Sequence, residues 1–262
     1  GFVGPELRFA GFDGLWVTGR AAQPVYLWIH NGQGEIRSAG HLWGKADLYE
    51  TQQAIKSEVG EPMARIASIG VAGENGVPMA GIFSDHGRSA ARTGLGALMG
   101  SKNLKAVAVR GTTKISLEWP DVYRGLRVAA NKDLLEQNMT AVMRETGSSG
   151  AADYLQMLGD MPQKYWTQAA FEEATDIGGA TMAETILTGT RACQGCVISC
   201  GREVTISTGP YAAPGQKIKG PEYETICSFG SQLLVHDLPL ITALGNTCDA
   251  LGLDSISAGN TI

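Results

Sequence analysis

Hydrophobic and polar positions follow different patterns in the two halves of the chain. Up to about residue 115, short runs rich in β-branched and aromatic residues alternate with turn residues, which predicts strands. The predicted strands are Gly14–Thr18, Pro24–His30, Arg65–Gly70, Val77–Phe83 and Ala106–Val109. Between them, residues 46–59 carry apolar side chains at helical spacing, and Gly60 is a typical helix end. This half is therefore predicted to be α+β.

After Ser116 the spacing of apolar residues becomes mainly helical. Helices are predicted at Asp121–Gln137, Ala151–Leu158, Thr181–Leu187, Tyr223–Leu234 and Pro239–Leu251, with few strands. The Gly- and Pro-containing residues 207–220 predict a loop. We expect an α+β chain of two parts: a β-sheet-rich base domain over residues 1–115 and a mainly helical domain over residues 116–262, both incomplete.

Composition narrows the possible partners. The 262 residues are 44% hydrophobic and 18% charged, which is typical of a soluble globular protein. A net charge of −5 without a basic block argues against nucleic acid, and no apolar run is long enough to span a bilayer. The chain starts at Gly1 and stops at Ile262 within a continuing pattern, so we expect it to be a fragment of a longer protein.

The most informative chemistry is a group of three cysteines, Cys193, Cys196 and Cys200. Thiolates at this spacing suit an iron–sulfur cluster, zinc or Cu(I). Zinc would need further Cys or His ligands at finger spacing, and the histidines His30, His41, His86 and His236 are scattered. A disulfide framework is disfavoured because five cysteines in a chain of this length are few. The spacing favours a cluster over zinc. Cys227 and Cys248 are predicted to be buried apolar residues.

A glycine-rich stretch over residues 87–105 contains Arg88 and Arg92, four residues apart. Glycines let backbone N–H groups approach a phosphate, and two arginines at this spacing would converge on one anion if the stretch were helical. The glycine spacing matches neither the Walker nor the dinucleotide pattern. A tight packing turn with solvated arginines explains the stretch equally well.

Two pairs of carboxylates follow the cysteines. Glu222 and Glu224 fall in the predicted first turn of a helix that begins after Pro221, where they would either complement the helix dipole or serve as general acid or base. Asp249 and Asp254 flank Gly252, the predicted end of another helix. Acidic groups there meet an unfavourable dipole, which hints at a bound cation or N–H donors.

Together these motifs resemble the aldehyde:ferredoxin oxidoreductases, the tungsten-pterin enzymes of anaerobes. The matching segments come in the order of that family: residues 4–13, residues 88–105, the cysteine group, and residues 220–224 with residues 249–254. The resemblance extends over essentially the whole chain. It implies a β-sheet base domain followed by helical domains, with a bis-pterin tungsten (or molybdenum) centre and a [4Fe-4S] cluster.

The resemblance also implies roles for single residues. Those expected to line the pterin phosphates and their bridging magnesium are Arg88, Ser89, Ala91 and Arg92. Those expected to hold the second pterin are Asp249, Leu253 and Asp254. Cys193, Cys196 and Cys200 would bind the cluster, and Glu224 would lie beside the tungsten, where it assists water attack or proton transfer.

The implied reaction oxidises an aldehyde with water to a carboxylic acid and passes the electrons to ferredoxin, in the cytoplasm. Family members often carry a Glu-x-x-His motif for an iron at a dimer interface, but residues 243–246 read Ala-Leu-Gly-Asn here. That iron site is therefore not expected, and a homodimer is possible only without it. A fourth cluster cysteine, a second pterin motif and a catalytic histidine would lie beyond Ile262. Two alternatives remain: a related tungsten enzyme of benzoyl-CoA reductase type, and a non-catalytic iron–sulfur electron-transfer module.

Overall fold

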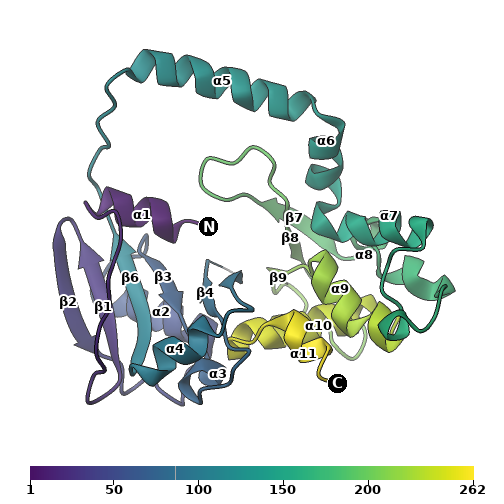
Figure 1. The fold of residues 1–262 in the computed structure, drawn as a ribbon, viewed down its shortest axis with the longest axis horizontal. Coiled ribbons are helices and arrows are strands. Elements are labelled where there is room, and N and C mark those ends of the chain that lie inside the picture. Colours follow the sequence, from purple (N-terminus) through teal and green to yellow (C-terminus); the bar gives the residue numbers. More distant parts are fainter. Residues whose placement is uncertain (86) are drawn as a thin grey trace. The chain divides into compact units, whose positions relative to one another are not determined.

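The computed structural model describes residues 1–85 and 87–262 (Figure 1). His86, considered above as a zinc ligand, lies outside the described residues. The chain divides into two compact units. The first contains residues 1–116 and 247–254, and the second contains residues 117–246 and 255–262. The mixture of helices and strands confirms the predicted α+β class, with a sheet-rich first part and a mainly helical second part.

In the described part of the first unit, six strands form one sheet in the order β2-β1-β6-β3-β4-β5. The strands are β1 (Val25–His30), β2 (Gln33–Ser38), β3 (Arg65–Ser68), β4 (Ile82–Ser84), β5 (Arg88–Ala90) and β6 (Leu104–Arg110). β1 and β6 are parallel, and the other neighbours are antiparallel. The helices of this unit are α1 (Val3–Phe9), α2 (Leu48–Val59), α3 (Val71–Glu74) and α4 (Leu95–Ser101).

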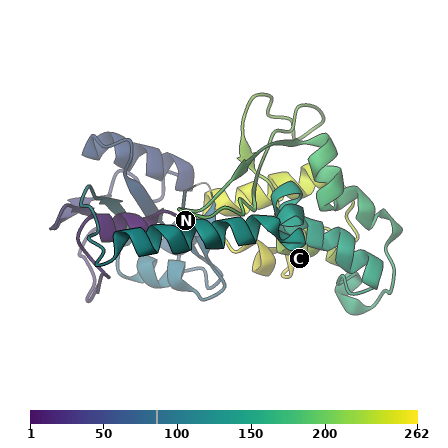
Figure 2. The same ribbon diagram turned by 90° about the horizontal axis from the view of Figure 1, so that it is seen from above.

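Alternating side chains give the sheet two apolar faces. Tyr26 and Trp28 of β1 pack with Ala106 and Ala108 of β6 and with Ile55 of α2 on one face. The intervening residues belong to the clusters on the other face, which include side chains of α1 and α4. A strand that is apolar on both faces needs cover on both, so α2 lies on one face of the sheet and α1 and α4 lie on the other (Figures 1 and 2).

Local signals explain most element ends. Asp47 accepts a hydrogen bond from the Glu50 N–H, the Glu50 carboxylate accepts one from the Asp47 N–H, and this capping box starts α2. Gly60 ends α2 in the left-handed conformation, as predicted. Asn31 and Gly32, both at positive φ, form the tight turn between β1 and β2. The strand β2 is polar and lies at the sheet edge, so its sequence lacks an alternating apolar pattern.

Two predicted strands are wrong. Residues 14–18 are irregular although their side chains suit a strand, and Trp16 in this segment is 93% exposed. β-propensity describes a fit to a pleated, half-buried surface, and here no neighbouring strand supplies one. Of residues 77–83, only Ile82 and Phe83 lie in a strand, because Pro78 and the preceding Gly76 place a turn before β4.

The second unit is mainly helical. Its α-helices are α5 (Pro120–Glu136), α6 (Asn138–Glu145), α7 (Gly150–Leu158), α8 (Gly179–Thr185), α9 (Tyr223–Phe229) and α11 (Ser255–Gly259), together with most of α10 (Leu238–Leu251). Short 3-10 turns are η1 (Gly147–Ser149), η2 (Lys164–Trp166), η3 (Glu172–Ile177) and η4 (Ser231–Leu233). A small antiparallel sheet, which the sequence did not predict, contains β7 (Leu187–Arg191), β8 (Gly201–Val204) and β9 (Ile218–Lys219).

The five predicted helices of the second half correspond to α5, α7, α8, α9 and α10. α9 is shorter than predicted because Gly230 has φ −106° and ψ −93°, which is outside the helical region. Within residues 1–85 and 87–262, no helix combines the length and apolar character that a membrane span requires.

A buried ion pair stabilises the first unit. The Lys105 side chain is fully buried and pairs with Glu74, whose other oxygen accepts the Gly44 N–H at 2.6 Å. Changing Lys105 to Met leaves the Glu74 charge buried without its cation, so we expect the free energy of unfolding to fall by about 3–5 kcal/mol. The exposed control Lys45→Met should leave it nearly unchanged. Urea unfolding measures both, and an equal effect of the two variants would contradict the prediction.

Candidate functional site

The sequence-predicted site residues fall into two groups, one in each unit. Arg88, Ser89, Ala91 and Arg92 belong to the first unit, as do Asp249, Leu253 and Asp254 from the late segment that joins it. The three cysteines and Glu224 belong to the second unit. Each group is therefore a site in its own right, with its own supporting elements.

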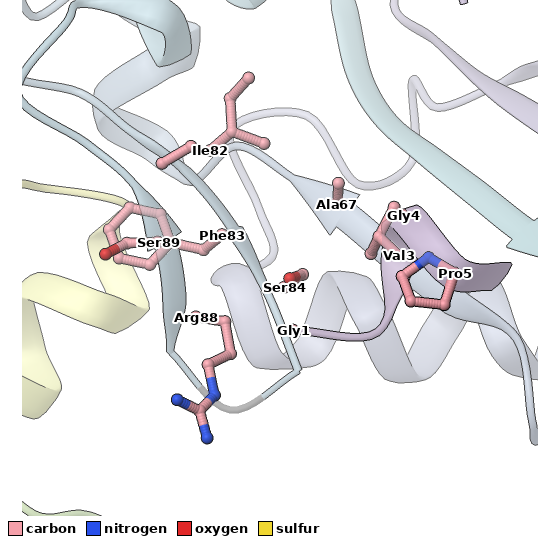
Figure 3. Close-up of a pocket in the computed structure, with 11 residues that line it drawn as sticks. Gly1, Val3, Gly4, Pro5, Ala67, Ile82, Phe83, Ser84, Arg88 and Ser89 are labelled. Carbon is pink, nitrogen blue, oxygen red and sulfur yellow. The ribbon is translucent and has the colours of Figure 1, made fainter. Parts of the chain in front are cut away.

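The hairpin of β4 and β5 carries Arg88 and Ser89. In this hairpin, Phe83 pairs with Ser89 and Ser84 pairs with Arg88. The hairpin borders a cavity of about 420 Å³ whose other wall comes from the start of α1 (Figure 3). The lining residues are Gly1, Val3, Gly4, Pro5, Ala67, Ile82, Phe83, Ser84, Arg88, Ser89 and Ala90. The first two matching segments thus share one cavity of the size that small ligands occupy.

Arg92 lies beyond this cavity, after the end of β5. Residues 88–90 are a strand and Arg92 has a φ of +62°, so the helical convergence of Arg88 and Arg92 considered above does not occur. Gly94, at φ +70°, is the N-cap residue of α4 and provides no side-chain cap. The arginines are presented by a strand and a turn rather than by successive turns of a helix.

Residues 252–254 are attached to this region by backbone hydrogen bonds. Leu253 forms an antiparallel bridge with Ala80. The Gly81 N–H donates to the Gly252 carbonyl at 3.0 Å, and the Asp254 N–H donates to the Met79 carbonyl at 3.0 Å. These contacts join residues 252–254 to the segment immediately before β4.

The attachment brings Asp254 close to Arg92. The Arg92 Nη1 lies 3.9 Å from the Asp254 Oδ2, which is an electrostatic contact beyond hydrogen-bond distance. The Asp254 side chain is 5% exposed and the Arg92 side chain is 56% exposed. The structure therefore joins two sequence-predicted site residues that are 162 positions apart.

Glycines make this close approach possible. A Cβ atom on Gly70 would lie 2.2 Å from the Leu251 carbonyl oxygen and 2.6 Å from the Gly252 nitrogen. Gly252 itself has a φ of +76° at the end of α10, which confirms the predicted helix stop. Any side chain at position 70 would separate the two backbones.

Asp249 and Asp254 are both buried, and their charges act on neighbouring groups. Burial raises the pKa of the Cys248 thiol to about 11, and these two carboxylates add to the shift. Burial also raises the pKa of Tyr49 in α2, with a further contribution from Asp249. Buried carboxylates need hydrogen-bond donors, and the amino and ring N–H groups of a pterin are donors of the required kind. The buried carboxylates of the first unit are therefore acceptors that match the N–H groups of a pterin.

The three cysteines occupy the loop between two paired strands. β7 and β8 are antiparallel, with Arg191 opposite Gly201, and residues 192–200 connect them. Cys193 and Cys200 are partly buried, Cys196 is exposed, and none forms a disulfide. The Cys196 N–H donates to the Cys193 carbonyl at 3.2 Å, which closes the turn. One short loop thus carries all three thiols.

Two arginines hold this loop against the C-terminal end of α6. Arg144 donates to the Val197 carbonyl. Arg202, in β8, donates to the Ser199 carbonyl at 2.6 Å and to the Arg144 and Glu145 carbonyls at 2.8 Å. Gly147 lets the loop come close, because a Cβ there would lie 2.7 Å from the Cys200 carbonyl oxygen. The loop backbone is therefore fixed at both Val197 and Ser199.

The donor set of this loop fits an iron–sulfur cluster, because three free thiols lie within eight residues. Among the residues that the structure describes, no group of three or more Cys, His, Asp or Glu side chains is gathered closely enough to hold a metal ion. The fit therefore rests on the donor type and the shared loop.

Glu224 lies in the first turn of α9, as predicted, and its side chain is exposed. Its neighbour Glu222 is the residue before the helix and accepts a hydrogen bond from the Ser148 hydroxyl, which in turn accepts the Tyr223 N–H at 3.2 Å. Burial raises the pKa of the Cys227 thiol to about 11, and the Glu224 charge adds to the shift. Glu222 thus anchors the start of α9, while Glu224 remains accessible.

Sequence reasoning missed Arg202 and Arg144. The signal for Arg202 was its place two residues after Cys200, in a strand that the sequence did not reveal. Arg144 lies in α6, which was also not predicted. Neither residue belongs to a motif, so only the folded loop shows what the two arginines contact.

Two family models together match almost the whole chain. The N-terminal domain of aldehyde ferredoxin oxidoreductase matches residues 1–111, and domains 2 and 3 of the same family match residues 126–262. The tungsten-containing aldehyde ferredoxin oxidoreductase of Pyrococcus furiosus is 37% identical over the whole chain. The chain spans 42% of the length of that relative.

Two further similar proteins are named for substrates other than aldehydes. The aliphatic sulfonate oxidoreductase, WOR-like subunit, of Pyrococcus furiosus is 32% identical over 99% of the chain and 43% of that relative. A solved structure of the active site complex BamBC of benzoyl coenzyme A reductase, with 1,5-dienoyl-CoA, is 30% identical with a TM-score of 0.79. The match covers 99% of this chain and 40% of the chain in that structure.

The contact between Gly70 and Gly252 gives a direct test of the first site. Gly70→Ala should lower the free energy of unfolding by about 3 kcal/mol, because the new methyl group meets rigid backbone. It should also make residues 251–254 sensitive to limited proteolysis. Gly14→Ala is the control, since a Cβ there meets nothing within 4 Å. Equal unfolding and cleavage of both variants would show that the contact does not hold the segment.

Proposed function

Because this chain belongs to the aldehyde ferredoxin oxidoreductase family, we propose that it is the cofactor-holding part of a tungsten-pterin oxidoreductase that converts aldehydes to carboxylic acids. The observation that carries the proposal is the set of backbone hydrogen bonds between residues 252–254 and residues 79–81. These bonds place the buried Asp254 carboxylate 3.9 Å from the Arg92 guanidinium. Two distant segments that the family resemblance assigns to the pterin cofactor meet at this point, which supports the proposal.

The first unit would hold the pterin groups. Arg88 and Arg92 supply cations for phosphate oxygens, and magnesium would bridge those phosphates beside Ser89 and Ala91. Asp249 and Asp254 supply buried acceptors for pterin N–H groups, with Leu253 fixed between them by its bridge to Ala80. Phosphate binding is thus proposed for residues 1–115. Binding of the second pterin is proposed for Asp249, Leu253 and Asp254, which lie within residues 116–262.

The second unit would hold the [4Fe-4S] cluster through Cys193, Cys196 and Cys200. The free thiols, the closed turn at Cys193 and the two loop arginines support this assignment. When bound, the tungsten (or molybdenum) bis-pterin supplies two-electron redox chemistry and the cluster supplies one-electron transfer. The part of this chain is to position both groups and to set their surroundings.

Glu224 is the proposed acid–base residue. Its carboxylate is accessible at the first turn of α9, whereas Glu222 is occupied by Ser148. Held beside the substrate, Glu224 would accept a proton from the water that adds to the aldehyde carbon. The whole reaction consumes one aldehyde and one water and releases one carboxylic acid, two protons and two electrons. Ferredoxin is the proposed acceptor of the electrons.

The similarity to the benzoyl coenzyme A reductase complex supports a second candidate function. The whole chain follows that structure with a TM-score of 0.79, so the same cofactors could serve reduction of an aromatic thioester. A screen with aldehydes, aliphatic sulfonates and benzoyl-CoA, each with a viologen dye, would separate these chemistries. A purified protein with iron but without tungsten and pterin would instead indicate an electron-transfer module.

The cysteine assignment predicts which thiols the cluster requires. In protein purified without oxygen, Cys193→Ser, Cys196→Ser and Cys200→Ser should each lose most of the iron and acid-labile sulfide. Cys248→Ser should keep both, because that thiol is buried within the first unit, whereas the cysteine loop belongs to the second. Iron retained by all four variants, or zinc in place of iron in the unmodified protein, would contradict the assignment.

The role of Glu224 predicts a loss of rate without a loss of cofactor. Glu224→Gln should lower kcat/KM for aldehyde oxidation by about 10²-fold or more, the usual contribution of a general acid or base. Tungsten, pterin and iron contents should stay unchanged. The exposed Glu184 of α8 provides the matched control, Glu184→Gln, which should keep full activity. Normal activity of Glu224→Gln would exclude it as the acid–base residue.

A further inference from the structure

Arg202 is a buried cation beside the cysteine loop. Only 3% of the residue is exposed, and it follows Cys200 by two positions in β8. Its guanidinium donates to backbone carbonyls of Met143, Arg144 and Glu145 at the end of α6, and to the Ser199 carbonyl within the loop. One side chain therefore joins the loop to a helix end.

The charge of Arg202 is not cancelled by these contacts. All four hydrogen-bond acceptors are neutral carbonyl oxygens. Within the described ranges 1–85 and 87–262, its buried Nε has no hydrogen-bond partner. Burial lowers the pKa of Arg202, the charges of Cys200 and Glu222 raise it, and the charge of Arg144 lowers it. An arginine keeps its charge under such conditions.

A purely structural role explains only part of this arrangement. A cation at a helix C-terminus binds the last carbonyls and complements the dipole, which accounts for the contacts with residues 143–145. Arg144 also holds the loop, through Val197, but its side chain is exposed to solvent. Solvent screens the charge of Arg144, whereas the charge of Arg202 acts in a medium of low dielectric constant. Both arginines therefore hold the loop, but of the two only Arg202 is buried.

We propose that Arg202 is a positioning residue for the cysteine loop whose buried charge raises the reduction potential of the cluster bound there. Reduction adds one negative charge to the cluster, and a nearby buried cation stabilises the reduced form. Local charge and hydrogen bonding to the sulfurs are the means by which proteins set cluster potentials. The inference rests on the proposed cluster site and adds to it a residue that sets how readily electrons leave for ferredoxin.

The test compares three variants of the protein purified without oxygen: Arg202→Met, Arg202→Lys and Arg144→Met. The readouts are iron content, the cluster's midpoint potential from EPR-monitored titration, and the unfolding midpoint. Arg202→Met should make reduction at least tenfold less favourable, a shift of about 59 mV to lower potential for one electron. Arg202→Lys keeps the charge and should keep the potential while losing some iron.

Arg144→Met controls for loosening of the loop. It should lower iron content or unfolding midpoint while leaving the potential near that of the unmodified protein. An unchanged potential in Arg202→Met, or an equal shift in Arg144→Met, would overturn the proposal. If Arg202→Met does not fold, Arg202→Gln decides: it keeps N–H donors for the backbone carbonyls but removes the charge, so it should lower the potential, and an unchanged potential would overturn the proposal. Absence of iron from the unmodified protein would instead overturn the proposed cluster.

Discussion

The candidate pterin site depends on the close approach of two glycines. Gly70 and Gly252 bring backbone against backbone, since a Cβ on Gly70 would lie 2.2 Å from the Leu251 carbonyl oxygen. Only with that spacing do the hydrogen bonds of Gly81 and Asp254 form, and these bonds fix the direction of residues 252–254. The burial of Asp254 and its position near Arg92 follow from these hydrogen bonds. A local property of glycine therefore determines the electrostatics of a site assembled from distant segments.

The two units address opposite electrostatic problems. The first buries the carboxylates Asp249 and Asp254, which suits a ligand rich in N–H donors. The second buries the cation Arg202 beside thiols, which suits an anionic cluster. A ligand of opposite character would interact favourably with the buried charge in each case. The distribution of buried charge thus supports the same cofactor assignment as the motifs.

The sequence predicted the parts of this structure that local rules control. The α2 helix, its end at Gly60, the stop at Gly252 and the first turn of α9 at Glu224 all follow from spacing and capping. The strand predictions failed where pairing with a neighbouring strand decides whether a segment is a strand. Residues 14–18 have side chains typical of a strand but pair with no strand in the described structure. β2 has a polar sequence but is a strand because it pairs with β1. Arg202 was missed for a related reason, because β8 became recognisable only through its pairing with β7.

The range of similar proteins indicates what this chain determines and what it leaves to its surroundings. Relatives named for aldehydes, aliphatic sulfonates and benzoyl coenzyme A match it over nearly its whole length, at 30–37% identity. One fold is therefore compatible with several substrates, and fold alone does not choose among them. The glycine contact, the buried aspartates and the loop arginines are all proposed to hold or tune cofactors. Exposed Glu224 is the candidate residue proposed to act on a substrate, so differences in chemistry are expected to depend on what surrounds that carboxylate rather than on the residues proposed to hold the cofactors.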